Sequence, residues 1–143
     1  KSKTFNHYFH IKMYFCNRKS KIYMIKKLDE TNILLKKIIN VIQEAKGKEI
    51  TSLDLRNIDS AICKYFIICT GTSNIHVNSI ENKIKKIILK ELGEKPYNTE
   101  GNNLGEWVLI DYYDIIVHIF QEKTRIFYNI EEFWGDAKFK NYK

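Results

Sequence analysis

The residues whose types could support phosphoryl chemistry are the Gly71-Thr72-Ser73 turn and two acids, Asp111 and Asp114. A small turn between a strand and a helix can hold a phosphate at the helix N-terminus. Nucleotidyl transfer also needs two acids spaced two apart on one strand, so that both project toward magnesium. Asp111 and Asp114 are three apart, across a predicted turn, and there is no Walker sequence. We therefore predict no catalytic residue, no metal and no cofactor, and keep a nucleotidyltransferase-like nucleotide-binding protein as the alternative.

Histidine and cysteine form no pattern typical of a metal site or a nucleophile. His76 and His118 are the histidines after residue 27, and neither has a second ligand at metal-binding spacing. We expect His118 to pack or hydrogen-bond inside the domain. His76 follows the start of a predicted helix, where we expect a neutral ring that bonds locally. Cys63 and Cys69 adjoin an apolar run and form no C-x-x-C pair, so reduced, buried thiols are the simplest interpretation.

The elements that would position these residues follow from hydrophobic periodicity. Apolar residues spaced three and four apart predict helices at 29–47, with Asp29 and Thr31 as cap candidates, and at 73–93, capped by Ser73. Short β-rich apolar runs predict strands. The order indicates an α/β fold with a single mixed β-sheet of about five strands packed with helices. The predicted strands span 50–55, 65–69, 97–100, 106–111 and 114–120, and a short helix or two turns span 124–134.

The last two strands are predicted to form a hairpin whose faces differ. With Tyr112-Tyr113 as a two-residue loop, Asp111 faces Asp114 and the two faces alternate along each strand. One face is wholly apolar and must meet the helices, while the other is aromatic and aliphatic with both acids at its turn end. The apolar face holds Val108, Ile110, Ile115, Val117 and Ile119; the other holds Trp107, Leu109, Asp111, Asp114, Ile116, His118 and Phe120.

Two interpretations of the acidic turn stay open. Opposed carboxylates repel each other, and a partner that supplies Arg or Lys would resolve the repulsion. Alternatively, the acids point into water at the hairpin tip and Trp107 is covered by the last helix, because acids are common at turns.

Positive charge is concentrated at the start of the chain. Residues 1–27 hold eight Lys/Arg and no acid, which leaves 24 − 8 = 16 bases against 17 acids, a net charge of −1, for residues 28–143. The formal net charge of +7 therefore does not describe the folded part, and a general RNA-binding domain is disfavoured. We expect residues 1–27 to be an organelle-targeting extension or a poorly ordered basic tail, and residues 28–143 to be one domain. No apolar run is long enough to cross a bilayer, so no membrane partner is predicted.

A series of different short motifs lies between Asp29 and Ala137, most of them in the second half of the domain. In the first half they are Leu53-Asp54-Leu55, Tyr65-Phe66-Ile67-Ile68, Thr70-Gly71-Thr72-Ser73 and His76-Val77. In the second half they are Glu100-Gly101, Gly105-Glu106-Trp107-Val108-Leu109-Ile110-Asp111-Tyr112, Asp114, Val117-His118, Phe120, Arg125, Phe127-Tyr128 and Trp134-Gly135-Asp136-Ala137. Together, and in this order, these segments resemble the Iojap/RsfS family of ribosomal silencing factors.

The resemblance implies a non-enzymatic factor that binds the large ribosomal subunit through the L-fourteen protein, blocks joining of the small subunit and so represses translation. It implies a homodimer with a nucleotidyltransferase-like fold that lacks the catalytic acids, and no direct sequence-specific contact with nucleic acid. Eukaryotic members act in plastids or mitochondria, so an organellar location is favoured and a cytoplasmic one is the alternative. The hairpin face then supplies the candidate partner-binding residues, which are Trp107, Leu109, Asp111, Asp114 and His118.

Three residues depart from the pattern of that family. Lys64 stands where Asp is usual, Ile75 where a basic residue often precedes His, and Tyr113 where Gly commonly closes the hairpin. A type I′ turn needs a positive φ at the position of Tyr113, and a Tyr side chain resists it. The predicted strand register therefore depends on this turn.

Overall fold

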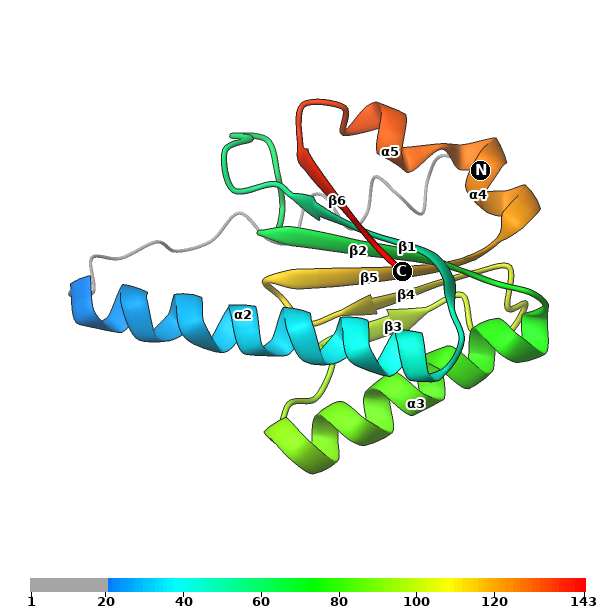
Figure 1. Ribbon diagram of the computed structural model, residues 1–143, viewed down its shortest axis with the longest axis horizontal. Helices are drawn as coiled ribbons and strands as arrows, with labels where there is room; N and C mark the ends of the chain where they lie inside the picture. The colour runs from blue at the N-terminus through cyan, green and yellow to red at the C-terminus, as the bar shows by residue number, and fades with distance from the viewer. Residues whose placement is uncertain (1–20) are drawn as a thin grey trace.

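The computed structural model describes the backbone of residues 21–143 and the side chains from Lys26 onward, so most of the predicted leader lies outside the described residues. Within that range, helices and strands follow one another along the chain (Figure 1). They are α2 (Lys21–Glu44), β1 (Lys48–Asp54), β2 (Tyr65–Gly71), α3 (Asn74–Leu92), β3 (Asn98–Glu100), β4 (Trp107–Asp111), β5 (Ile115–Gln121), α4 (Glu122–Tyr128), α5 (Ile130–Phe133) and β6 (Lys138–Tyr142).

The strands form one mixed six-stranded sheet in the order β3-β4-β5-β2-β1-β6. β2 and β5 are parallel, and the other neighbouring pairs are antiparallel. α2 and α3 cover one face of the sheet, and α4 and α5 lie on the other (Figure 1). The predicted α/β class and mixed sheet are confirmed, but the prediction of about five strands missed β6. β6 is an edge strand in which Lys138 and Lys140 interrupt the apolar residues, a common protection of sheet edges that hides the strand from a hydrophobicity pattern.

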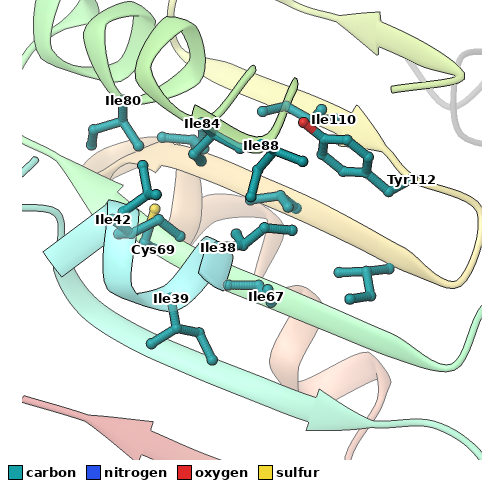
Figure 2. Packing of buried hydrophobic residues seen from close by; sticks show 14 of the residues in the cluster. Ile38, Ile39, Ile42, Ile67, Cys69, Ile80, Ile84, Ile88, Ile110 and Tyr112 are labelled. Carbon is teal, nitrogen blue, oxygen red and sulfur yellow. The ribbon is translucent and has the colours of Figure 1, made fainter. Parts of the chain in front are cut away.

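The main core lies between the sheet and the two long helices. Ile38 and Ile42 of α2 and Ile84 and Ile88 of α3 point toward the strands (Figure 2) and are fully buried. The predicted apolar face of the β4–β5 hairpin is buried in the same cluster, which confirms which side meets the helices. These hairpin residues are Val108, Ile110, Ile115, Val117 and Ile119.

α2 starts earlier than predicted. The helix begins at Lys21, so Asp29 and Thr31 lie inside it and the prediction that they cap its N-terminus was wrong. Thr31 is buried, and its hydroxyl lies 2.9 Å from the carbonyl oxygen of Lys27, one turn back in the helix. Thr31, although Thr is a typical capping residue, thus lies in the middle of α2 and contacts the preceding turn of the helix.

α3 begins and ends where the sequence predicts. The Oγ of Ser73 accepts a hydrogen bond from the N–H of His76 at 3.1 Å, and Gly93, with a φ of 69°, ends the helix. Gly71, just before the cap, lets the helix approach the sheet closely, because a Cβ there would lie 2.7 Å from Cγ2 of Val77. The Gly-Thr-Ser motif therefore has a structural explanation.

The register of the β4–β5 hairpin is shifted by two residues from the predicted one. Asp111 pairs with Ile116 instead of Asp114, and Trp107 pairs with Phe120. Because side chains alternate with a period of two, an even shift changes the cross-strand partners but leaves each strand residue on its predicted face.

The shift originates at the turn. Tyr113 has a φ of 66°, and the N–H of Asp114 donates to the carbonyl oxygen of Tyr112 at 2.9 Å, the pattern of a γ-turn. The exposed ring of Tyr113 packs against that of Tyr97 with centroids 4.7 Å apart. The N–H of Tyr112 donates to the carbonyl oxygen of Ile115 at 2.9 Å, so the two-residue loop is Tyr113-Asp114, one residue later than the predicted Tyr112-Tyr113 loop.

Candidate functional site

Asp111, one of the predicted contact residues, is used inside the hairpin. It is 3% exposed, and its Oδ1 accepts a hydrogen bond of 2.6 Å from the backbone N–H of Tyr113. This bond holds the residue whose φ is positive. Asp111 does not face Asp114 across the strands, so the predicted repulsion between opposed carboxylates does not occur.

Asp114 joins the turn to two other elements. Its carboxylate accepts a hydrogen bond from Nζ of Lys64 at 2.9 Å and lies 3.2 Å from the hydroxyl of Thr31 in α2. Its carbonyl oxygen accepts the backbone N–H groups of Lys64 and Tyr65 at 2.9 and 3.0 Å. Neither interpretation of the acidic turn holds for Asp114, because the cation comes from this chain and the carboxylate does not simply point into water.

His118 lies within β5, opposite Leu109 of β4, and is 1% exposed. Burial lowers the pKa of His118 to about 3, so its ring is neutral. The Nδ1 atom of His118 accepts a hydrogen bond from Nε1 of Trp107 at 3.1 Å, and the ring of Phe66 meets it edge-to-face with centroids 4.6 Å apart. The predicted packing and hydrogen-bonding role of His118 is confirmed, and a direct contact with a partner would require its covering side chains to move.

Trp107 connects this buried cluster to the surface. Its half-buried indole stacks on Phe120 with centroids 4.8 Å apart, and Tyr128 of α4 packs on it at the same distance. The interpretation in which a late helix covers Trp107 is therefore correct for the part of the ring beneath Tyr128. Leu109, on the same face of β4, is also only partly buried.

Large apolar side chains of α4 and α5 stand in solvent. Ile126, Phe127 and Phe133 are 71%, 78% and 72% exposed, and Tyr128 links them to Trp107. We call the surface formed by Ile126, Phe127, Tyr128 and Phe133 the α4–α5 face. Exposed apolar groups of this size, gathered on two adjacent short helices, are typical of an interaction surface.

The α4–α5 face was missed in the sequence. The available signal was the spacing of Phe127, Ile130 and Phe133, which predicts a helix without showing which side is buried. Asn129, with a φ of 40°, ends α4 and changes the chain direction, so that Ile130 and Trp134 enter the core while both Phe side chains stay outside. The predicted helix or two turns over 124–134 is confirmed as two short helices.

Arg125 holds α4 and α5 in place. Its guanidinium pairs with Glu131 at 2.6 Å and donates to Oγ1 of Thr70 at 2.9 Å and to the carbonyl oxygen of Glu49 at 2.7 Å. One side chain thereby ties α4 to α5 and both to β1 and β2. The exposed apolar side chains therefore sit on an anchored segment.

The segment that carries the α4–α5 face, residues 122–136, has a net negative charge. Residues 122–136 contain four Asp/Glu and two Lys/Arg, a net charge of 2 − 4 = −2. On β3, Glu100 pairs with Leu109 and so projects from the same face of the sheet. A partner with an apolar centre and basic groups around it would complement this surface.

Two backbone donors at the Gly71-Thr72-Ser73 turn and the start of α3 are already bonded within the chain. The N–H of Thr72 donates to Nδ1 of His76 at 3.0 Å, and the N–H of His76 donates to Ser73. Nε2 of His76 lies 2.8 Å from the carbonyl oxygen of Ala45, so it must carry the proton of a neutral ring. The predicted local bonding of His76 is confirmed, and its ring occupies the N–H of Thr72.

Across the described residues, no three His, Cys, Asp or Glu side chains are grouped so as to hold a metal ion. The same part of the chain contains no helix with the length and apolar character of a bilayer-spanning segment.

The chain belongs to the family described as "Ribosomal silencing factor during starvation", whose model matches residues 28–143. It is thus a member of the ribosomal silencing factors that the motifs indicated. Ribosomal silencing factor RsfS of Halalkalibacterium halodurans is 36% identical over 104 residues, which cover 73% of this chain and 87% of that protein. A crystal structure of a protein from Chromobacterium violaceum is 35% identical, with a TM-score of 0.68, and covers 73% of this chain and 85% of that one.

Organellar proteins also match. The chloroplastic protein Iojap of Zea mays is 36% identical over 77 residues, which cover 52% of this chain and 32% of that protein. A mouse protein named "Mitochondrial assembly of ribosomal large subunit protein 1" is 28% identical over 72 residues, which cover 49% of this chain and 32% of that protein.

Proposed function

We propose that this silencing factor binds the large ribosomal subunit through its α4–α5 face and prevents joining of the small subunit. The observation that carries the proposal is the exposure of Ile126, Phe127 and Phe133 on helices that Arg125 anchors to the sheet. Family membership supplies the ribosomal context, and the name of the mouse relative points to the large subunit. Binding a rigid apolar surface involves little ordering of the protein, which favours affinity.

The charge around the face supports a protein partner rather than bare RNA. RNA would meet the net negative charge of residues 122–136, whereas a basic ribosomal protein would be attracted by it. The L-fourteen protein, which the family resemblance implies, is such a partner. Of the residues first proposed for contact, Trp107, Leu109 and Asp114 retain surface, whereas Asp111 and His118 act inside the fold.

The proposed mechanism is steric and needs no catalysis. Asp111 is bonded within its turn and Asp114 is paired with Lys64, so neither carboxylate is positioned with the other for magnesium. The N–H groups of Thr72 and His76 are bonded within the chain, which gives the nucleotide-binding alternative no support. A homodimer and an organellar location complete the proposal, supported by exposed apolar surface and by the match to a chloroplastic protein.

Co-sedimentation with isolated large ribosomal subunits tests the proposal. Phe127→Asp places a charge at the centre of the α4–α5 face and should weaken binding at least about tenfold, as loss of an interface anchor does. Ile75→Asp is the matched control, because Ile75 is equally exposed at 77% but lies on α3, on the other side of the sheet. Circular dichroism verifies that both variants are folded.

Equal binding by wild type and a folded Phe127→Asp variant would remove the α4–α5 face from the interface. Absence of binding by the wild-type chain would reject the large subunit as the partner. Light scattering of free chain and a subunit-joining assay then test the homodimer and the steric block separately.

A further inference from the structure

His118 and Trp107 form a polar contact beneath an apolar surface. The indole N–H of Trp107 donates to Nδ1 of His118 at 3.1 Å, and His118 is fully enclosed. Among the described residues, Nε2 of His118 has no hydrogen-bond partner. Because Nδ1 accepts a hydrogen bond from Trp107, the proton of the neutral imidazole must be on Nε2. The ring thus presents one used acceptor and one unused donor.

This arrangement is unfavourable if the side chain serves only to fill space. A buried N–H without an acceptor destabilises the folded state, and an apolar residue of similar size would avoid that penalty. The edge-to-face contact with Phe66, at 4.6 Å between centroids, gives the N–H side of the ring only a weak aromatic neighbour. The feature of His118 that an apolar residue lacks is the acceptor that Trp107 uses.

The orientation of the Trp107 indole matters because the ring contacts both the buried Phe120 and the exposed Tyr128. One side of the indole stacks on Phe120 with an interplanar angle of 25°, and Tyr128 packs on it at 46°. Stacking sets the plane of the indole but allows the ring to slide through small changes of its side-chain torsions, whereas a hydrogen bond at Nε1 fixes one edge. When the hydrogen bond fixes the Nε1 edge of the indole, the rest of the indole and the Tyr128 ring that packs on it are held in a single arrangement at the α4–α5 face.

We propose that His118 is a positioning residue of the α4–α5 face, acting through the indole of Trp107. It does not touch the partner, and its contribution to binding is to hold Trp107 and Tyr128 in their binding conformation. This inference rests on the proposed function of the face, but the orientation of Trp107 can be measured without a ribosome.

Two substitutions separate the acceptor from the volume of His118. His118→Asn places an amide oxygen near the position of Nδ1, and His118→Leu fills similar space without an acceptor. The indole N–H signal of Trp107, identified in full-length protein by its loss in Trp107→Phe, reports the hydrogen bond by NMR. We expect His118→Leu to move this signal upfield and speed its solvent exchange, and His118→Asn to preserve it.

Binding to isolated large subunits supplies the second readout. His118→Leu should weaken binding about five- to tenfold, the ratio that corresponds to one net hydrogen bond, and His118→Asn should restore most of it. In the Trp107→Phe background, His118→Leu should cause no further loss, because its effect passes through the indole.

Each alternative result is decisive. An unchanged indole signal in a folded His118→Leu variant overturns the proposal, as does an equal loss of binding in both variants or an additional loss in the Trp107→Phe background. If the wild-type chain fails to bind large subunits, the proposed function is rejected, and the NMR comparison still decides whether His118 orients Trp107.

Discussion

Acid should destabilise the folded state of this protein because His118 is buried as a neutral imidazole. Burial lowers the pKa of His118 from its ordinary value of 6.5 to about 3 in the folded chain. As pH falls below the ordinary value, the unfolded chain takes up a proton that the folded chain does not accept. The corresponding stability is therefore complete above the unfolded pKa and is lost progressively as pH falls toward the folded pKa.

The expected loss of stability is a substantial fraction of the free energy of unfolding of a small domain. One proton bound only by the unfolded state gives a slope of about 1.4 kcal/mol per pH unit. Between pH of about 7.5 and about 4.5, this amounts to a loss of about 3 kcal/mol in the free energy of unfolding. A typical domain has only about 5–15 kcal/mol in total.

Urea denaturation followed by tryptophan fluorescence at a series of pH values measures this loss. His118→Asn removes the titrating group, so its unfolding free energy should fall less over the same range. Asp54 contributes in the same direction, since Arg56 lowers the pKa of its carboxyl, but its ordinary value of 3.8 places its effect at lower pH. Trp107→Phe leaves His118 able to titrate and should retain the wild-type slope. Identical slopes for wild type and a folded His118→Asn variant would refute a buried, neutral imidazole.

Three further predictions concern the neighbouring hairpin turn. Tyr112→Phe should raise the free energy of unfolding by up to about 1 kcal/mol, measured by urea denaturation, because the Tyr112 hydroxyl is buried without a partner among the described residues; a loss would mean that the hydroxyl is satisfied. Tyr113→Gly should stabilise by about 1 kcal/mol by relieving a φ of 66°, partly offset by the lost contact with Tyr97, and a lower thermal midpoint would contradict this. Lys64→Met should destabilise by at most about 1 kcal/mol, with a smaller difference from wild type in high salt, since the ion pair with Asp114 is partly exposed; a salt-independent difference would exclude an ionic origin.

The residues of the core could be predicted from the sequence, because the local hydrophobic pattern and the observed burial agree there. The stripe of α3 is bounded by Ser73 and Gly93, and both caps form as predicted. The hairpin faces were also correct although the register was not, because a slip of two residues preserves the side of every strand residue. Periodicity therefore determines which side chains are buried more securely than it determines which residues are paired.

The candidate site was less predictable, because exposure on a short helix depends on where the helix docks. Phe127 and Ile130 have the same apolar character in the sequence, yet one is exposed and the other is buried. The difference follows from Asn129 and from the bonds of Arg125 to β1 and β2, which involve residues far apart in the chain. No local pattern contains that information, so the α4–α5 face was missed in the sequence and only hairpin residues were proposed for contact.

Two of the three departures from the family pattern meet at one place, which suggests why both are tolerated. Tyr113 itself adopts a left-handed backbone conformation in the hairpin turn, although it lacks the conformational freedom of glycine. The next residue, Asp114, is held by the side chain and backbone of Lys64, and Asp111 holds the N–H of Tyr113 itself. An acid at the position of Lys64 would repel Asp114 and loosen the same turn. The cation at this position thus offsets part of the strain at Tyr113, and the turn is stabilised by contacts with Lys64, just before β2, and with Asp111 of β4 rather than by its own residue preferences.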